Sequence, residues 1–164
     1  HLTITLRQAA PADAPAIADL VARAFGRPDE AGVIARLERD GDAWLSAVAI
    51  NADEVVGHIL FYHLRVLGRL GALGLGPMCV DPWVQRQRIG MSLIRYGLDA
   101  AKAAGVPIVF VLGHRDYYPR LGFSAEAAKD FASPFAGRAE FMALRLRHGP
   151  PMSGELIFPD AFGL

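Results

Sequence analysis

Apolar positions recur along this chain with two different periods, and each period predicts its own kind of element. Where they fall three and four residues apart, as at Ile17, Leu20 and Val21, they predict a helix with one apolar face. Helices are expected over Pro11–Gly26, Asp29–Arg39 and Ile89–Ala104, with a short one over Tyr117–Leu121. Runs rich in β-branched and aromatic residues predict strands over Thr3–Gln8, Trp44–Ile50, Glu54–Val66, Leu73–Val80, Pro107–Leu112, Glu140–Leu146 and Gly154–Phe158.

The order of these elements predicts the fold class. The link Asn51-Ala52-Asp53 favours a hairpin between the strands on either side of it. Pro107–Leu112 is an apolar run that follows a helix, which predicts a strand buried on both faces beside a parallel neighbour. The chain therefore predicts an α/β (α+β) fold, with a mixed sheet flanked by helices. No repeat and no long linker divides it, so residues 1–164 are expected to form one domain.

The strand Leu73–Val80 contains Gly76-Pro77, and proline within an apolar strand belongs at an edge or a bulge because it cannot donate to the ladder. We expect the sheet to split here. The backbone groups of Met78 and Val80 would then be unpaired and could bind an extended ligand with amide groups, such as pantetheine.

The loop after this strand leads directly into the most regular helix. Amides from about Arg86 to Ser92 would converge at the helix N-terminus, where partial positive charge favours a pyrophosphate. Gly90 permits close approach, and Gln85, Arg86 and Arg88 offer donors or charge at the rim. The helix itself carries a stripe of small and apolar residues that predicts close packing: Gly90, Leu93, Ile94, Gly97, Leu98 and Ala101.

This segment resembles the acyl-CoA-binding motif of the GNAT superfamily of N-acetyltransferases, (Gln/Arg)-x-x-Gly-x-(Gly/Ala), with Gln85 and Gly90 at its outer positions. The resemblance implies a centrally splayed sheet, acetyl-CoA as cosubstrate and no metal. Arg88 stands where the family usually has its first glycine. If this position needs a positive φ, arginine is strained; if it is helical, the guanidinium can reach a CoA phosphate. The implied cofactor-binding residues are Met78, Cys79, Val80, Gln85, Arg86, Gln87, Arg88, Ile89, Gly90, Met91 and Ser92.

A second motif lies downstream, where Tyr117-Tyr118-Pro119-Arg120-Leu121-Gly122-Phe123 resembles the family's Tyr-Tyr-x-Arg-x-Gly-Phe signature of a small bacterial branch. The tail Pro159-Asp160-Ala161-Phe162 fits the same branch. The resemblance implies that Tyr118 is catalytic: a phenol stays protonated at neutral pH and can donate to the departing thiolate. For Tyr117 we favour a packing role.

Acetyl transfer also requires that the attacking amine be neutral, and the sequence assigns no general base with certainty. His63, Asp81, His114 and Asp116 are alternatives, each of which also has an ordinary explanation as a solvated or hydrogen-bonded group. Cys79 is not expected to form an acyl-cysteine intermediate, because a lone cysteine in an apolar strand is usually inert.

Composition narrows the function classes. The chain has 52% hydrophobic and 21% charged residues, which is typical of a globular protein and not of a disordered one. Seventeen basic residues balance seventeen acidic ones, so no overall field attracts nucleic acid or an anionic membrane. No apolar run is long enough to span a bilayer and no signal-peptide pattern is present, so we expect a cytoplasmic protein. The single cysteine and the five scattered histidines predict no disulfide and no zinc site.

The sequence therefore predicts an N-acetyltransferase that moves an acetyl group from acetyl-CoA to a primary amine by direct attack. The alternative is a non-catalytic acyl-CoA sensor or interaction module with the same fold. A nucleotide-binding module is a weaker reading, because neither a P-loop nor Gly-x-Gly-x-x-Gly follows a suitable strand. The acceptor amine is not identified by the sequence, and the exposed strands expected near the C-terminus leave a homodimer open.

Overall fold

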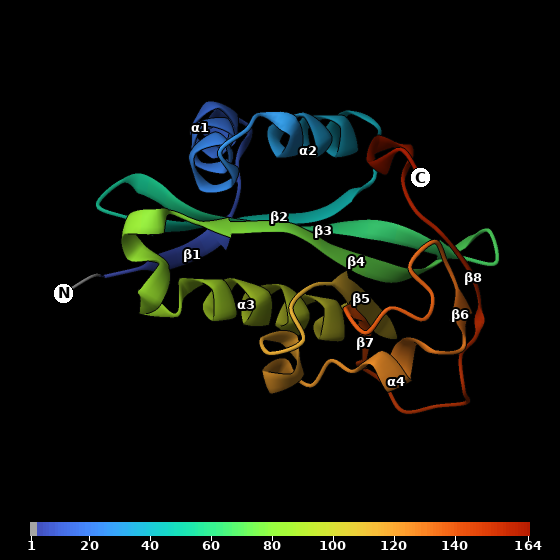
Figure 1. The fold of residues 1–164 in the computed structure, drawn as a ribbon. Coiled ribbons are helices and arrows are strands. Elements are labelled where there is room, and N and C mark those ends of the chain that lie inside the picture. The colour runs from blue at the N-terminus through green and yellow to red at the C-terminus, as the bar shows by residue number, and fades with distance from the viewer. Residues whose placement is uncertain (1–2) are drawn as a thin grey trace. The chain divides into compact units, whose positions relative to one another are not determined.

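The fold is a mixed sheet with helices on its faces, as the sequence predicts (Figure 1). The computed structural model describes residues 3–164, apart from the side chains of Leu70, Gln85, Arg86 and Gln87. Strands and helices follow one another as β1 (Thr5–Gln8), η1 (Pro11–Asp13), α1 (Ala14–Phe25), α2 (Asp29–Arg39), β2 (Ala43–Asn51), β3 (Glu54–Val66), β4 (Arg69–Val80), η2 (Pro82–Gln87), α3 (Ile89–Ala103), β5 (Ile108–Leu112), η3 (Tyr118–Leu121), α4 (Ala125–Ala128), β6 (Phe131–Ala132), β7 (Phe141–Arg145), β8 (Gly154–Ile157) and η4 (Asp160–Phe162), where η marks a 3-10 helix.

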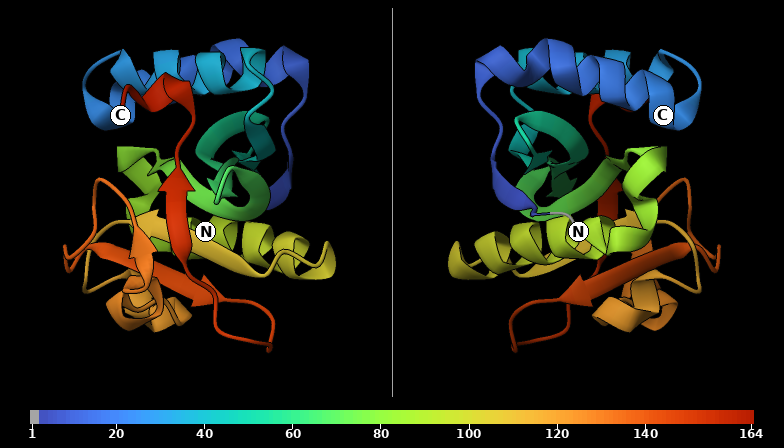
Figure 2. Two further views of the ribbon diagram at one scale, coloured as in Figure 1. Left: turned by 90° about the vertical axis from the view of Figure 1, so that its right-hand side faces the viewer. Right: turned by 90° about the vertical axis from the view of Figure 1, so that its left-hand side faces the viewer.

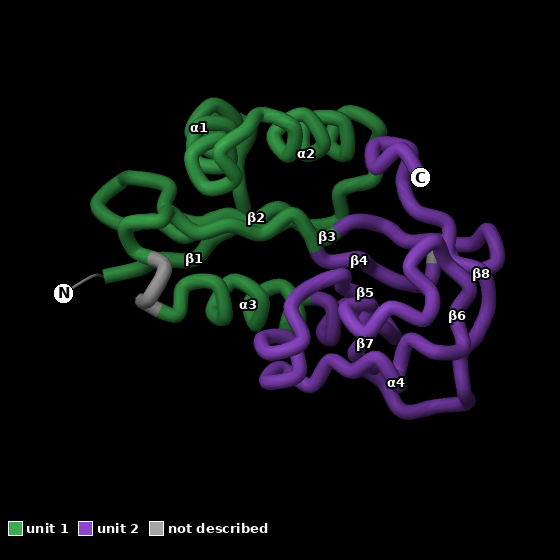
Figure 3. Tube along the Cα trace, in the orientation of Figure 1, with its two compact units in different colours: residues 1–61, 76–100 green, residues 62–75, 101–164 purple. Residues whose placement is uncertain are grey.

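The sheet has eight strands in the order β1-β2-β3-β4-β5-β7, with β8 paired to both β3 and β6. The chain divides into two compact units, which Figure 3 distinguishes by colour. Unit 1 contains the chain up to residue 61 and residues 76–100, and unit 2 contains residues 62–75 and 101–164. The long strands β3 and β4 each contribute to both units. That residues 1–164 act as one domain stays a prediction.

In unit 1, α1 and α2 lie on one side of the strands and α3 lies on the other (Figure 2). Helix α1 buries Ile17, Leu20 and Val21, which are the positions that its apolar spacing selects. It ends at Gly26, whose φ of +71° suits a residue without a Cβ and whose N–H donates to the carbonyl of Ala22. Because α2 buries Ile34 and Leu37 in the same way, the two helices form one apolar layer.

Helix α3 packs on β3 through glycines. A Cβ at Gly97 would overlap the ring of Phe61, and a Cβ at Gly57 would lie 2.9 Å from Cδ1 of Leu93. Leu93 and Ile94 are fully buried. The predicted stripe of small and apolar residues is therefore the face of α3 that touches the sheet.

In unit 2, Leu73–Leu75 of β4 pairs in parallel with Val109–Val111 of β5, and β7 pairs antiparallel on the other side of β5. The parallel neighbour predicted for Pro107–Leu112 is thus confirmed. Phe110 on β5 contacts Phe131 edge-on at a centroid distance of 4.8 Å and Phe141 in a stacked arrangement at 5.6 Å. These rings fill the core of the unit.

Several elements differ from the sequence predictions. Strand β4 begins at Arg69 and not at Leu73, because Leu67 and Gly68, both with positive φ, close a tight turn after β3. The short helix predicted over Tyr117–Leu121 is a single 3-10 turn. The four-residue helix α4 was not predicted. Its start has the expected cap, since the Oγ of Ser124 accepts from the N–H of Ala127 at 3.1 Å.

Two further observations concern the described residues. None of the helices formed by them is both long enough and apolar enough to cross a membrane. Within the same residues, no group of three or more His, Cys, Asp and Glu side chains is arranged to hold a metal ion.

The packing of α3 gives the first testable prediction. Gly97→Ala should lower the free energy of unfolding by about 1–3 kcal/mol, because the added methyl group meets the Phe61 ring. Gly32→Ala is the matched control: this glycine lies inside α2 with no atom within 4 Å of its would-be Cβ, so the change should raise stability by about 0.5–1 kcal/mol. Urea denaturation of both variants tests the pair, and equal effects would contradict the packing.

Candidate functional site

Strand β4 extends well beyond its last pair with β5, and this extension is the first part of the candidate site. Leu75 pairs with Val111, and β5 ends one residue later, whereas β4 continues to Val80. The extension begins with Gly76, at a φ of +136°, and Pro77, which has no N–H to donate. The break in strand pairing predicted at Gly76-Pro77 therefore lies where β4 continues beyond its last pair with β5.

Three residues of this extension were predicted to contact the cofactor. Met78 is half-buried, and Cys79 and Val80 are buried. Val80 already has an interaction partner within the protein, so its backbone groups are not counted as free.

Asp81 fixes the turn that follows β4. Its Oδ1 accepts from the N–H of Trp83 at 3.0 Å, and its Oδ2 pairs with the guanidinium of Arg23 at 3.2 Å. Its own N–H donates to the carbonyl of Val56 at 2.7 Å. Both carboxylate oxygens are thus engaged in holding η2 in place, which argues against Asp81 as a general base.

Arg88 occupies the left-handed region, with φ +57° and ψ +21°, between η2 and α3. The position therefore has the conformation that glycine adopts without strain, which is the first of the two alternatives raised by the sequence. A non-glycine residue there costs on the order of 1 kcal/mol. The side chain of Arg88 is exposed. The side chains of Gln85, Arg86 and Gln87, which were also predicted to contact the cofactor, lie outside the described residues.

The first turn of α3 presents fewer amides than expected. The N–H of Ser92 donates to the carbonyl of Arg88 at 3.1 Å and belongs to the helical ladder. Ser92 was predicted as a cofactor-binding residue, and its amide is not available for that role. The N–H groups of Ile89, Gly90 and Met91 precede the first such bond and point along the axis from the positive end of the helix dipole.

Tyr118 lies in unit 2, whereas residues 78–92 lie in unit 1. Its side chain is 8% exposed and sits edge-on between Tyr117 and Phe123, at centroid distances of 5.2 and 5.7 Å. A Cβ at Gly113 would overlap its ring. Burial, and then the neighbouring Tyr117, raises the pKa of Tyr118 to about 12, so the hydroxyl is protonated at neutral pH and can donate.

The amino-acid sequence matches a known family. A sequence model of the acetyltransferase (GNAT) domain matches residues 5–125, which is most of the chain. The chain belongs to the GNAT acetyltransferase family.

Related GNAT proteins include two from Escherichia coli K12. The uncharacterized N-acetyltransferase YjhQ is 38% identical over 129 residues, which cover 75% of this chain and 71% of YjhQ. The uncharacterized N-acetyltransferase YhbS is 32% identical over 134 residues, 80% of each chain.

Solved GNAT structures superpose on the whole chain. A crystal structure of E. coli YhbS in complex with CoA has a TM-score of 0.90 at 29% identity and covers 100% of this chain and 94% of YhbS. A GNAT acetyltransferase from Brucella melitensis in complex with acetyl-CoA has a TM-score of 0.83 at 31% identity and covers 99% of each chain.

Burial makes Cys79 of this GNAT chain an unsuitable nucleophile. Its side chain is 7% exposed, and desolvation raises the pKa of the thiol to about 12. A protonated thiol attacks a thioester poorly. The expectation that Cys79 forms no acyl intermediate is supported by this protonation state.

The remaining candidates for the general base differ in how far their side chains are exposed to solvent. His114 and Asp116 are exposed, and His63 is half-buried on the part of β3 that belongs to unit 2. None of these three side chains makes a hydrogen bond or ion pair within the described part of the chain. They stay alternatives.

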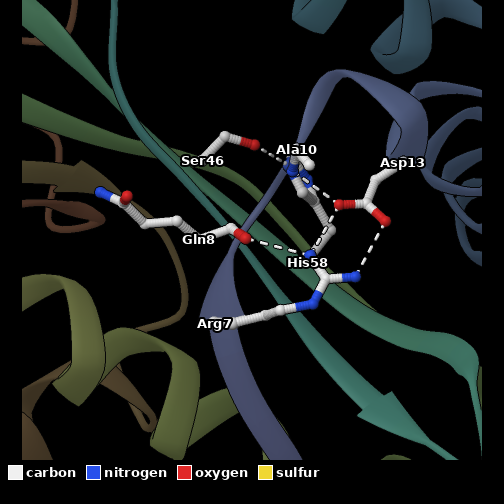
Figure 4. Close-up of polar contacts among 6 residues, drawn as sticks. All are labelled: Arg7, Gln8, Ala10, Asp13, Ser46 and His58. Carbon is white, nitrogen blue, oxygen red and sulfur yellow. Dashed lines mark hydrogen bonds and ion pairs between the residues drawn. The ribbon is translucent and has the colours of Figure 1, made fainter.

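His58 is a buried histidine that the sequence did not single out. It is fully buried on β3, and its Nε2 lies 2.8 Å from the Oγ of Ser46 (Figure 4). Its Nδ1 is buried without a hydrogen-bond partner among the described residues. Desolvation lowers the pKa of His58 to about 4, so the ring is neutral at pH 7. Because the side chain is fully buried, no substrate amine can reach it.

Arg88 yields a prediction about local strain. Arg88→Gly should raise the free energy of unfolding by up to about 1 kcal/mol, because glycine adopts a positive φ freely. Arg88→Ala is the control, since it also removes the charge but keeps the strained Cβ, and it should not stabilise. Chemical denaturation distinguishes the two variants, and equal stabilities would show that no positive φ is required here.

His58 yields a prediction about pH. Between about pH 6.5 and 4 the histidine is protonated in the unfolded chain but not in the folded protein. The free energy of unfolding therefore falls by up to about 3 kcal/mol as the pH falls through this range. His58→Leu should remove that part of the loss. Urea titrations of the wild-type protein and of His58→Leu from pH 7.5 to 4 make the comparison, and an equal loss of stability in both proteins would contradict the prediction.

Proposed function

We propose that this protein is an acetyl-CoA-dependent N-acetyltransferase that acts on a primary amine. The observation that carries the proposal is the continuous segment in unit 1 formed by the β4 extension, η2, Arg88 and the start of α3. It combines an extended strand edge with a helix N-terminus, and a ligand with an amide-bearing arm and a pyrophosphate needs both. Family membership and relatives bound to CoA and acetyl-CoA support the same assignment.

Each end of the cosubstrate has its own group of donors in this proposal. The pyrophosphate binds the N–H groups of Ile89, Gly90 and Met91, and the helix dipole adds to the attraction. Arg88, exposed at the same helix start, supplies a positive charge close to the phosphates. The pantetheine arm lies along β4 beyond Pro77, where Met78 is the first residue able to donate a backbone N–H.

The chemistry is a direct acyl transfer. The neutral amine attacks the thioester carbonyl, whose oxygen accepts a hydrogen bond from a backbone N–H such as that of Met78. A carbon–nitrogen bond forms as the carbon–sulfur bond breaks, and the departing thiolate takes a proton from the hydroxyl of Tyr118. The substrate ammonium first loses one proton to give the neutral amine, and its nitrogen loses a second proton once the carbon–nitrogen bond has formed; both protons pass to solvent water, either directly or through His63, His114 or Asp116. Solvent water then returns a proton to the phenolate of Tyr118.

A non-catalytic acyl-CoA sensor is the second candidate function. The observation in its favour is that, of the four base candidates, Asp81 is occupied by structural contacts. The protonated, buried hydroxyl of Tyr118 argues for catalysis, because a sensor needs no proton donor.

Calorimetry with acetyl-CoA tests whether the protein binds this cosubstrate, and turnover by Tyr118→Phe tests whether the tyrosine is catalytic. Acetyl-CoA should bind the wild-type protein and Tyr118→Phe with similar affinity, because the hydroxyl is not needed for binding. With an accepted amine, kcat of Tyr118→Phe should fall on the order of 10²-fold, as expected for loss of a general acid. Free thiol released from CoA measures turnover.

Three results would contradict parts of this assignment. Absence of acetyl-CoA binding at millimolar concentration removes the cosubstrate. Unchanged turnover in Tyr118→Phe removes the tyrosine from the mechanism. Binding without CoA release across a panel of polyamines, amino acids, aminoglycosides and peptide N-termini favours the sensor.

A further inference from the structure

A hollow of about 440 Å³ lies within unit 1, between η1, α1, α2 and β2. Its walls are mainly alanines, among them Ala14 and Ala18 on α1 and Ala31 and Ala35 on α2. Ile17 and Ile34 form its apolar base. Its volume and its apolar lining with few polar groups are those of small-molecule sites in proteins. None of the described side chains of the acyl-CoA segment lines it.

Polar contacts hold Ala10, one of the residues that line the hollow, and Figure 4 shows these contacts. Arg7 and Asp13 form a two-pronged ion pair with distances of 2.7 and 3.0 Å, and the same carboxylate accepts from the N–H of Ala10 at 2.6 Å. These contacts lower the pKa of Asp13 to about 2, so the ion pair is intact at neutral pH. Because Ala10 lines the hollow, its wall is held in place before any ligand binds.

Ser46 on β2 is an uncharged polar residue among those that line the hollow. Its carbonyl accepts from the N–H of Ala9 at 2.9 Å, and its Oγ pairs with the buried His58. A hydroxyl can donate once and accept twice, so Ser46 keeps capacity for one more hydrogen bond. The serine is only partly buried and is among the residues that line the hollow, so this capacity is open to a ligand there.

Glu38 is the charged residue among those that line the hollow. The neighbouring charges are paired: Arg36 contacts Asp40 at 3.3 Å, and Arg27 contacts Glu30 at 2.7 Å. The carboxylate of Glu38 makes no hydrogen bond or ion pair with any side chain that the structure describes. An occupant therefore meets an uncompensated negative charge, which favours a cation and disfavours an anion.

We propose that this hollow is a binding site for a small monoamine with a compact apolar body. The apolar part lies between the alanines of α1 and α2, the ammonium group pairs with Glu38, and Ser46 gives one further hydrogen bond. The site is separate from the acyl-CoA segment, so its occupation does not depend on acetyl transfer.

The test uses phenethylamine, phenethyl alcohol and hydrocinnamate, which share an aromatic body and differ in charge. Each is titrated into the protein saturated with CoA, with NMR of carbon-13-labelled alanine methyl groups as the readout. The methyl signals of Ala18, Ala31 and Ala35 should shift with the amine. The amine should bind about 2- to 5-fold more tightly than the alcohol, as expected for an exposed ion pair, and the carboxylate most weakly.

Two variants with matched controls localise the effect. Ala18→Leu fills the hollow from an exposed position and should weaken amine binding at least about 10-fold, whereas Ala16→Leu, on the same helix and outside the hollow, should not. Glu38→Gln should remove the preference for the amine over the alcohol, and Glu54→Gln, an exposed acid elsewhere in unit 1, should keep it.

Either of two results overturns the proposal. One is amine binding that Ala18→Leu leaves unchanged, since the ligand then sits elsewhere. The other is an equal or stronger response to hydrocinnamate, which would make the hollow an anion or purely apolar site. Failure of acetyl-CoA to bind would contradict the proposed transferase activity. The amine titrations, repeated without CoA, would still test whether the hollow binds the amine.

Discussion

The close contact between α3 and β3 is the constraint on which the arrangement of unit 1 depends. Gly97 allows the ring of Phe61 to lie against the helix backbone, and Gly57 gives the same freedom to Leu93 on the other side of the contact. Since α3 starts directly after η2, and Asp81 ties the start of η2 to β3 and α1, the first amides of α3 have a fixed direction. The helix N-terminus can attract a pyrophosphate at a defined place because its helix cannot rotate or shift on the sheet.

Burial determines the protonation state of the groups that would otherwise compete for the chemistry. Desolvation keeps the phenol of Tyr118 and the thiol of Cys79 protonated and the imidazole of His58 neutral. The same physical effect, burial away from water, thus yields a neutral proton donor in unit 2 and an inert thiol and an inaccessible base in unit 1. Because the buried His58 is inaccessible, the proposed reaction has the amine lose its protons to water, directly or through His63, His114 or Asp116, while the thiolate receives one from Tyr118.

The sequence predicted those features that follow from periodicity and failed where backbone conformation depends on contacts. The apolar spacing of α1 and the buried run of β5 both gave the correct elements. The amide of Ser92 was assigned to the cofactor because the sequence cannot show where a helical ladder begins. The role of Asp81 was missed because Arg23 and Val56, its partners, are distant in sequence. Arg88 was predicted in part. The motif identified the position, but its positive φ could be learned only from the structure.

On the helices α1 and α2, the residues that stabilise the fold are different from those that line the hollow. Leu20, Val21 and Leu37 are completely buried and hold the helices to the sheet, whereas Ala18 and Ala35 are exposed and face the hollow. A larger side chain at an exposed alanine displaces solvent and leaves the core contacts intact, so it changes the volume of the hollow with little effect on folding. The ion pair of Arg7 and Asp13 supports this division, because it fixes the wall of the hollow through Ala10 without using any apolar contact of the core. Selectivity at this place can therefore vary while the fold that presents the acyl-CoA segment stays the same.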